Sequence, residues 1–99
     1  MDNLGELSKT LIADKKTQQD CDVVKKAAEV KTDKHYAVFT AICYKSQLVA
    51  GTNFFIKVHV GGSDCIHLRV FEALPCNGGG LTLGGVQEGK ALDDPIIYF

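Results

Sequence analysis

Two strand-like runs joined by a short apolar link most constrain how this 99-residue chain can fold. Residues 36–46 and 52–60 are rich in β-branched and aromatic residues, which favour extended strands. The link between them, Gln47–Gly51, has the length of a hairpin loop. Hairpin tips are usually polar, but the middle of this one is apolar: Leu48, Val49 and Ala50. An exposed apolar tip adds nothing to a core, so it indicates a surface that enters a partner's cleft.

A second hairpin is predicted around the turn sequence Gly61–Asp64. The apolar faces of its two strands match when Val58 lies opposite Leu68, and the outer face then places His59 opposite His67. Two imidazoles can bind a metal ion or respond to pH, but no third ligand is evident nearby. We therefore expect a partly exposed surface pair rather than a metal site.

An amphipathic helix is predicted from Thr17 to about Lys31, with Thr17 and Asp20 as its capping arrangement. The apolar positions that form its stripe are Cys21, Val24 and Ala28, with Val23, Ala27 and Val30 beside them. The stripe's side chains are small, so the helix needs a sheet to pack against. We therefore expect one helix packed on a twisted antiparallel sheet of about four to five strands, which is an α+β fold.

The connection over residues 72–80 resembles the first loop, because it too is expected to expose apolar residues at its tip, here the pair Leu74-Pro75. Pro75 interrupts the strand ladder, and the glycines after it let the chain reverse. Since successive antiparallel strands reverse direction, both loops should leave the same end of the sheet. The final strand is expected to begin at residues 81–83, and residues 96–99 are expected to close the sheet.

Residues 84–91 contain Gly-x4-Gly-Lys, the glycine-rich part of a phosphate-binding loop. Ala91 lacks the hydroxyl that would bind magnesium, and the helix-breaking run 93–95 follows where the motif needs a helix. Nucleotide binding is therefore not expected. Cys65 and His67 share one face of the sheet, but nothing around them supplies a substrate pocket, so no catalytic residue and no enzyme are predicted.

Length and composition indicate one domain over residues 1–99, with residues 1–12 as a flexible N-terminal arm. A formal net charge of −1 argues against nucleic-acid and membrane partners. The N-terminal residues show neither a basic region nor an apolar signal region, so a cytoplasmic location is expected, with the nucleus as an alternative. We expect free thiols at all four cysteines, which are Cys21, Cys43, Cys65 and Cys76. We expect no bound metal ion and no other cofactor.

The two loops resemble those of the stefins, which are type 1 members of the cystatin superfamily of cysteine-protease inhibitors. Residues 47–51 match the stefin signature Gln-x-Val-x-Gly, and Leu74-Pro75 stands at the place of the second stefin binding loop. Gly5 holds the place of a glycine that stefins carry in the N-terminal arm. Asp20 departs from the pattern, since stefins usually have an apolar residue there.

The resemblance implies a cystatin-like fold and reversible, tight-binding inhibition of papain-like proteases such as cathepsins L, B, H and S. The N-terminal arm and the two loops would fill the active-site cleft as a wedge, and no residue would react with the catalytic cysteine. The residues implied as protease-binding are Gly5, Gln47, Leu48, Val49, Ala50, Gly51, Leu74, Pro75 and Cys76. Gly51→Trp or deletion of residues 1–5 is expected to weaken inhibition without unfolding the domain.

A second hypothesis belongs to another class of protein. The chain could be a noninhibitory scaffold that self-associates, because opening the first hairpin would let two copies exchange a helix-plus-strand unit. The expected state is then a domain-swapped dimer, whereas the inhibitor hypothesis expects a monomer. Titration of active papain with the isolated monomer separates the two hypotheses.

Overall fold

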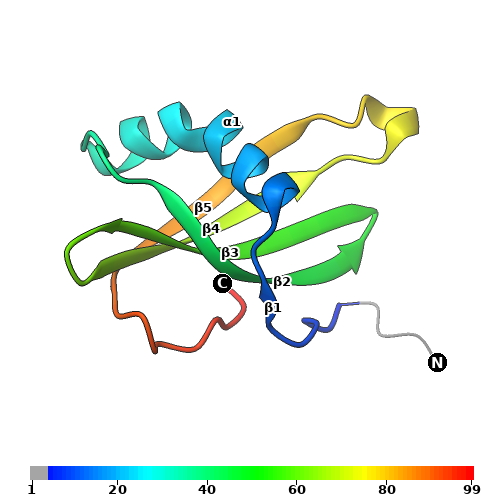
Figure 1. Ribbon diagram of the computed structural model, residues 1–99. Helices are drawn as coiled ribbons and strands as arrows, with labels where there is room; N and C mark the ends of the chain where they lie inside the picture. The colour runs from blue at the N-terminus through cyan, green and yellow to red at the C-terminus, as the bar shows by residue number, and fades with distance from the viewer. Residues whose placement is uncertain (1–4) are drawn as a thin grey trace.

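The computed structural model describes residues 5–99 as one helix packed across a five-stranded antiparallel sheet (Figure 1). Neighbouring strands follow the chain order, from β1 at one edge to β5 at the other. The elements are β1 (Leu11–Ile12), α1 (Lys15–Thr32), β2 (Thr40–Val49), β3 (Gly51–Gly61), β4 (Asp64–Glu72), the 3₁₀ turn η1 (Pro75–Asn77) and β5 (Leu81–Lys90). The predicted α+β architecture is confirmed.

Helix α1 begins after Asp14, whose side chain accepts a hydrogen bond from the backbone N–H of Thr17 at 2.9 Å. The Thr17 hydroxyl in turn accepts from the Asp14 N–H at 3.3 Å, which completes a capping box. The pKa of the Asp14 carboxyl is lowered because both the backbone N–H and the hydroxyl of Thr17 donate to its Oδ1 atom. The cap predicted at Thr17 and Asp20 is therefore wrong, since Thr17 lies inside the first turn. The helix ends at Thr32 and is capped by Asp33, which adopts a left-handed φ of 58°.

The main core lies between α1 and the face of the sheet that α1 covers. The helix contributes Cys21, Val24 and Ala28, as the stripe predicted. The fully buried strand residues of this cluster are Ile56, Val58, Leu68 and Val70. Val23 and Val30, which were expected beside the stripe, are exposed because a single sheet covers only a narrow sector of the helix.

The register of the β3–β4 hairpin differs from the predicted one by two residues: Val58 lies opposite Ile66, not Leu68. An irregularity between His59 and Gly61 and a short turn account for the shift. A slip of two residues returns every side chain to the same face, so matching the apolar faces could not distinguish the two registers. The predicted His59–His67 pair is therefore wrong, and Lys57 lies opposite His67.

The last residues of the chain cover the other face of the sheet, below the strands in Figure 1. The Lys57 ammonium donates hydrogen bonds to the backbone carbonyls of Leu92 and Asp94. The Phe55 ring packs against Tyr98 and Phe99, with both centroid separations at 5.7 Å. The expected closing strand at residues 96–99 is thus wrong, because β5 already completes the sheet and runs through the glycine-rich segment.

His67 is fully buried beneath this C-terminal segment, and neither of its ring nitrogens has a hydrogen-bond partner among the described residues. Burial lowers the pKa of His67 to about 4, and the nearby charges of Lys57 and Lys90 act in the same direction. The Asp94 carboxylate opposes them only weakly. A partly exposed imidazole pair on this face, as the sequence predicted, is therefore incorrect.

Stability should fall in mildly acidic solution because of His67. A histidine in the unfolded chain titrates near 6.5, whereas folded His67 stays neutral until about pH 4. Between these values the unfolded state binds more protons, so the free energy of unfolding decreases as the pH falls. We expect His67 to account for a loss of about 2 kcal/mol between pH 7 and pH 5.

Urea unfolding of a His67→Leu variant at both pH values tests this, with His35→Leu at an exposed position as the control. The His67 variant should lose most of this pH dependence, and the His35 variant should keep it. An identical pH dependence in the wild type and the His67 variant would contradict the assignment.

Candidate functional site

The β2–β3 turn, the β4–β5 loop and the first described residues of the chain lie at the same end of the molecule, on the right in Figure 1. The pairing of Thr52 with Glu72 brings the turn and the loop side by side. A bridge between Leu7 and Gln47 places the N-terminal segment on the other side of the turn. The structure therefore gathers the three segments that the sequence singled out, and residues 1–4 of the predicted arm lie outside the described residues.

The first hairpin tip is tighter than the five-residue loop that was predicted. Strand β2 runs to Val49 and β3 starts at Gly51, so only Ala50 lies between them. Because side chains alternate along a strand, Leu48 is 62% exposed whereas Gln47 is only 7% exposed. The apolar surface that this tip offers to a partner comes mainly from Leu48 and Ala50, with Val49 half-buried between them.

Gly51 is buried where the hairpin contacts β4. Its φ of +127° is a conformation that other residues rarely adopt. A Cβ atom added here would lie 2.6 Å from the Glu72 carbonyl oxygen and 2.7 Å from Cζ of Phe71. The expectation that Gly51→Trp leaves the fold intact is therefore wrong, because no side chain fits between the hairpin and β4.

The second loop is a compact turn held by its own backbone. The Leu74 carbonyl accepts from the N–H groups of Asn77 and Gly79, at 2.8 and 3.0 Å. The Ala73 N–H donates to the Gly80 carbonyl at 3.0 Å and closes the loop at its base. Leu74 is 41% exposed at the tip. The two residues that follow it, Pro75 and Cys76, are also exposed.

The N-terminal segment is hydrogen-bonded to β2 from the first residue that the structure describes. Gly5 donates its N–H to the Leu48 carbonyl at 3.3 Å and accepts from Nε2 of Gln47 at 2.8 Å. The Ser8 N–H donates to the Ser46 carbonyl at 2.8 Å. Residues 11–12 form β1, so the segment expected as an arm over residues 1–12 joins the sheet well before the helix.

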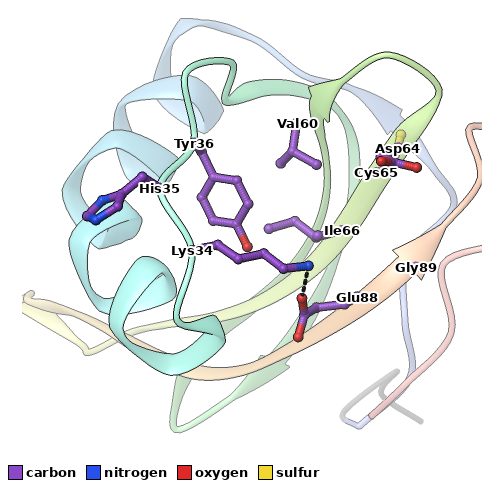
Figure 2. Close-up of a pocket in the computed structure, with 9 residues that line it drawn as sticks. All are labelled: Lys34, His35, Tyr36, Val60, Asp64, Cys65, Ile66, Glu88 and Gly89. Carbon is purple, nitrogen blue, oxygen red and sulfur yellow. Dashed lines mark ion pairs between the residues drawn. The ribbon is translucent and has the colours of Figure 1, made fainter.

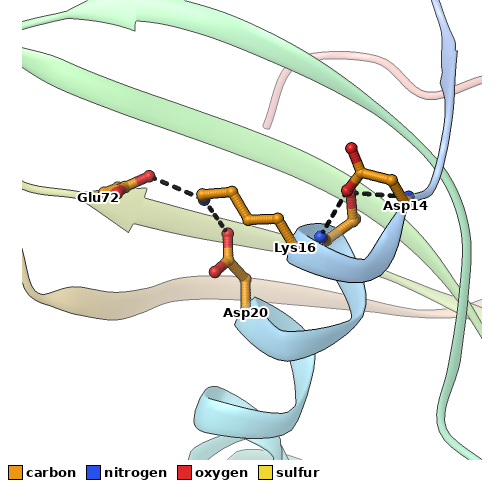
Figure 3. Close-up of polar contacts among 5 residues, drawn as sticks. Asp14, Lys16, Asp20 and Glu72 are labelled. Carbon is orange, nitrogen blue, oxygen red and sulfur yellow. Dashed lines mark hydrogen bonds and ion pairs between the residues drawn. The ribbon is translucent and has the colours of Figure 1, made fainter.

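A partly exposed charge network ties α1 to the strand that carries the second loop (Figure 3). The Lys16 ammonium lies 2.8 Å from Asp20 Oδ2 and 3.1 Å from Glu72 Oε1. It also lies 4.8 Å from the centre of the Phe54 ring. Burial alone would lower the pKa of Lys16, but hydrogen bonds to the two carboxylates outweigh it and raise the pKa. Sequence reasoning missed this network, although Lys16 and Asp20 have the spacing of a helical ion pair.

An open pocket of about 380 Å³ lies at the opposite end of the sheet, near the β3–β4 turn (Figure 2). The Lys34–Glu88 ion pair spans its mouth at 2.7 Å. No group of three or more metal-ligating side chains is found in residues 5–99. The glycine-rich segment that raised the nucleotide hypothesis is part of β5, where Gly85 leaves room for the Phe99 ring.

The thiols give no further site. Each of the four cysteines is free, and all four lie within the described residues. Burial raises the pKa of Cys21 to about 12, which keeps this thiol protonated and unreactive. Within residues 5–99, the helical segments lack the combination of length and hydropathy that a membrane-spanning helix needs.

Comparison with known proteins connects this geometry to one family. The Cystatin domain family matches residues 5–93 of the chain. The chain is 57% identical to Cystatin-B of Oplegnathus fasciatus over 95 residues, which cover 96% of this chain and 95% of that protein. It is 48% identical to Cystatin-B of Homo sapiens and 46% identical to that of Paralichthys olivaceus, each over 96% of this chain and 97% of the relative.

The close contact at Gly51 predicts an unequal response to alanine at two glycines. Gly51→Ala should lower the free energy of unfolding by about 2–4 kcal/mol, because backbone strain adds to the overlap with β4. Gly62→Ala is the matched control, since its φ is +55° and open space surrounds it, and it should cost about 1 kcal/mol. Urea unfolding midpoints measure both, and equal losses would show that β4 does not restrict position 51.

Proposed function

Because the chain belongs to the cystatin family, within which it is a stefin similar to Cystatin-B, we propose that it inhibits papain-like proteases by a three-part wedge. Cystatins are inhibitors of cysteine proteases and not enzymes. The wedge consists of Gly5, the hairpin tip Gln47–Gly51 and the loop tip Leu74–Cys76. It enters the active-site cleft reversibly, and none of its residues reacts with the catalytic cysteine.

The exposed apolar side chains at one end of the sheet carry the proposal. Leu48 and Leu74 come from separate loops, yet both are exposed at the same end beside Gly5. Scattered apolar residues are normal on a protein surface, but a row of apolar loop tips at one end fits a concave partner. The cleft of a papain-like protease has this shape, with apolar subsites on either side of the catalytic cysteine.

The energetics require a rigid wedge. Burial of each large apolar side chain supplies about 1.5–3 kcal/mol, whereas association costs roughly 4–15 kcal/mol. Nanomolar affinity needs about −12 kcal/mol net, so burial of the side chains of Leu48, Val49, Leu74 and Pro75 is not sufficient by itself. The backbone bonds within the second loop and the tight turn at Gly51 keep the loop tips ordered before binding, which reduces the entropic cost.

The proposed partners are cathepsins of the papain type, such as L, B, H and S, and the inhibitor acts as a monomer in the cytoplasm or nucleus.

Self-association through an opened first hairpin is the competing hypothesis. The β2–β3 turn is the hinge in that hypothesis, because β2 and β3 would separate there and pair with a second copy. A chain that functions only in this way would not inhibit a protease as a monomer.

Titration of active papain with the isolated monomer tests the proposal. The wild type should inhibit stoichiometrically, and Leu48→Asp and Leu74→Asp should each raise the inhibition constant at least tenfold, because a carboxylate would be buried in an apolar subsite. Leu92→Asp is the matched control, because Leu92 is 63% exposed but lies in the C-terminal segment on the other face of the sheet. Its inhibition constant should stay within about twofold of the wild type.

Absence of inhibition by the wild-type monomer would contradict the proposed function and favour the self-associating scaffold. Equal weakening by all three aspartate variants would show that the added charge acts without contact, and the wedge would then be wrong.

A further inference from the structure

Gln47 lies in the signature that suggests protease binding, but both ends of its side-chain amide are engaged inside the chain. Nε2 donates to the Gly5 carbonyl oxygen at 2.8 Å, and Oε1 accepts from Nδ2 of Asn53 at 2.9 Å. Only 7% of the residue is exposed. A side chain buried and bonded in this way adds little surface to an interface, so its contribution must come through the groups that it holds.

The Gly5 carbonyl fixes the orientation of the Gln47 amide. A carbonyl oxygen can only accept, so Nε2 of Gln47 must face Gly5, and Oε1 of Gln47 then faces the donating Nδ2 of Asn53. The two residues are opposed across β2 and β3, which holds Asn53 in place. The position of Gly5 is thereby coupled through one amide to both strands of the first hairpin.

Gly5 is exposed, and the space beside its Cα is open. Its φ is +89°, and apart from its chain neighbours no atom of the described residues lies within 4 Å of the place where a Cβ would be. Its N–H bond to the Leu48 carbonyl is long, at 3.3 Å, and the segment next pairs with β2 at Leu7, which forms a bridge with Gln47. The bond from Gln47 is the shorter of the two that Gly5 makes, and it determines where the Gly5 carbonyl points.

We infer that Gln47 is a positioning residue, whose amide fixes the N-terminal segment against the hairpin tip and so sets the angle at which that segment enters the protease cleft. The inference rests on the proposed wedge. It assigns Gln47 a role within the inhibitor in place of a direct contact with the protease. Loss of the Gln47 amide should therefore matter only while Gly5 is present.

A double-mutant cycle with Gln47→Glu and deletion of residues 1–5 tests the inference. Glutamate keeps the size of the side chain and can still accept from Asn53, but its carboxylate cannot donate to the Gly5 carbonyl. In the full-length chain the inhibition constant for papain should rise roughly tenfold, the scale of one lost hydrogen bond. In the truncated chain the same substitution should change it by less than about twofold.

Gln19→Glu is the matched control, because it adds the same charge at an exposed helix position and should leave inhibition unchanged in both backgrounds. An equal rise on Gln47→Glu in the full-length and truncated chains would overturn the inference, since the residue would then act without Gly5. No effect in the full-length chain would overturn it as well.

A measurement without protease separates this inference from the proposed function. In uncomplexed Gln47→Glu, backbone ¹⁵N order parameters should fall at Gly5 and Glu6 and stay at wild-type values at Ala50 and Gly51. Unchanged order at Gly5 would refute the positioning role even if inhibition weakened. If the wild type failed to inhibit papain while Gly5 lost order as expected, the wedge would be wrong and the contact between Gln47 and Gly5 would stand.

Discussion

Burial of β3 on both faces is the constraint on which the rest of the structure depends. Four consecutive residues of this strand, Phe55 to Val58, are almost completely buried, although alternation sends them to opposite sides of the sheet. Helix α1 covers the face with Ile56 and Val58, and the C-terminal segment covers the face with Phe55 and Lys57. The helix and the C-terminal segment are thus both used to cover the two sides of β3. The ends of the hairpins stay uncovered and can project from the sheet.

The part of the fold that follows from periodicity could be predicted from the sequence, and the part that follows from pairing could not. The alternation of apolar residues from Phe54 to Val60 identified β3 and the face that packs on α1. The register of β3 with β4 depends on an irregularity between His59 and Gly61, which leaves no signature in the apolar pattern. The error made a buried His67 look like one half of an exposed imidazole pair.

The candidate site likewise has one part that could be predicted from the sequence and one part that could not. Apolar tips at Leu48 and Leu74 and their common end of the sheet follow from composition and antiparallel geometry. The roles of Gln47 and Lys16 arise from hydrogen bonds and ion pairs between residues far apart in the sequence, which spacing alone does not reveal. Gln47 links the N-terminal segment to the first hairpin, and Lys16 links α1 to the end of β4 beside the second loop. The sequence motif marks where such a site lies, and the polar contacts determine how its segments are arranged.

The contact between Lys57 and the C-terminal segment involves only main-chain oxygens, because the ammonium bonds to the carbonyls of Leu92 and Asp94. Every residue type presents the same carbonyl, so this anchor is independent of side-chain identity at either position. The Leu92 side chain is exposed and contributes nothing to it. The contact with Lys57 can therefore persist while the amino acids at positions 92 and 94 diverge between species, whereas the end of the segment depends on the rings of Tyr98 and Phe99. Sequence drift at these two positions would then carry no information about whether the contact with Lys57 is retained.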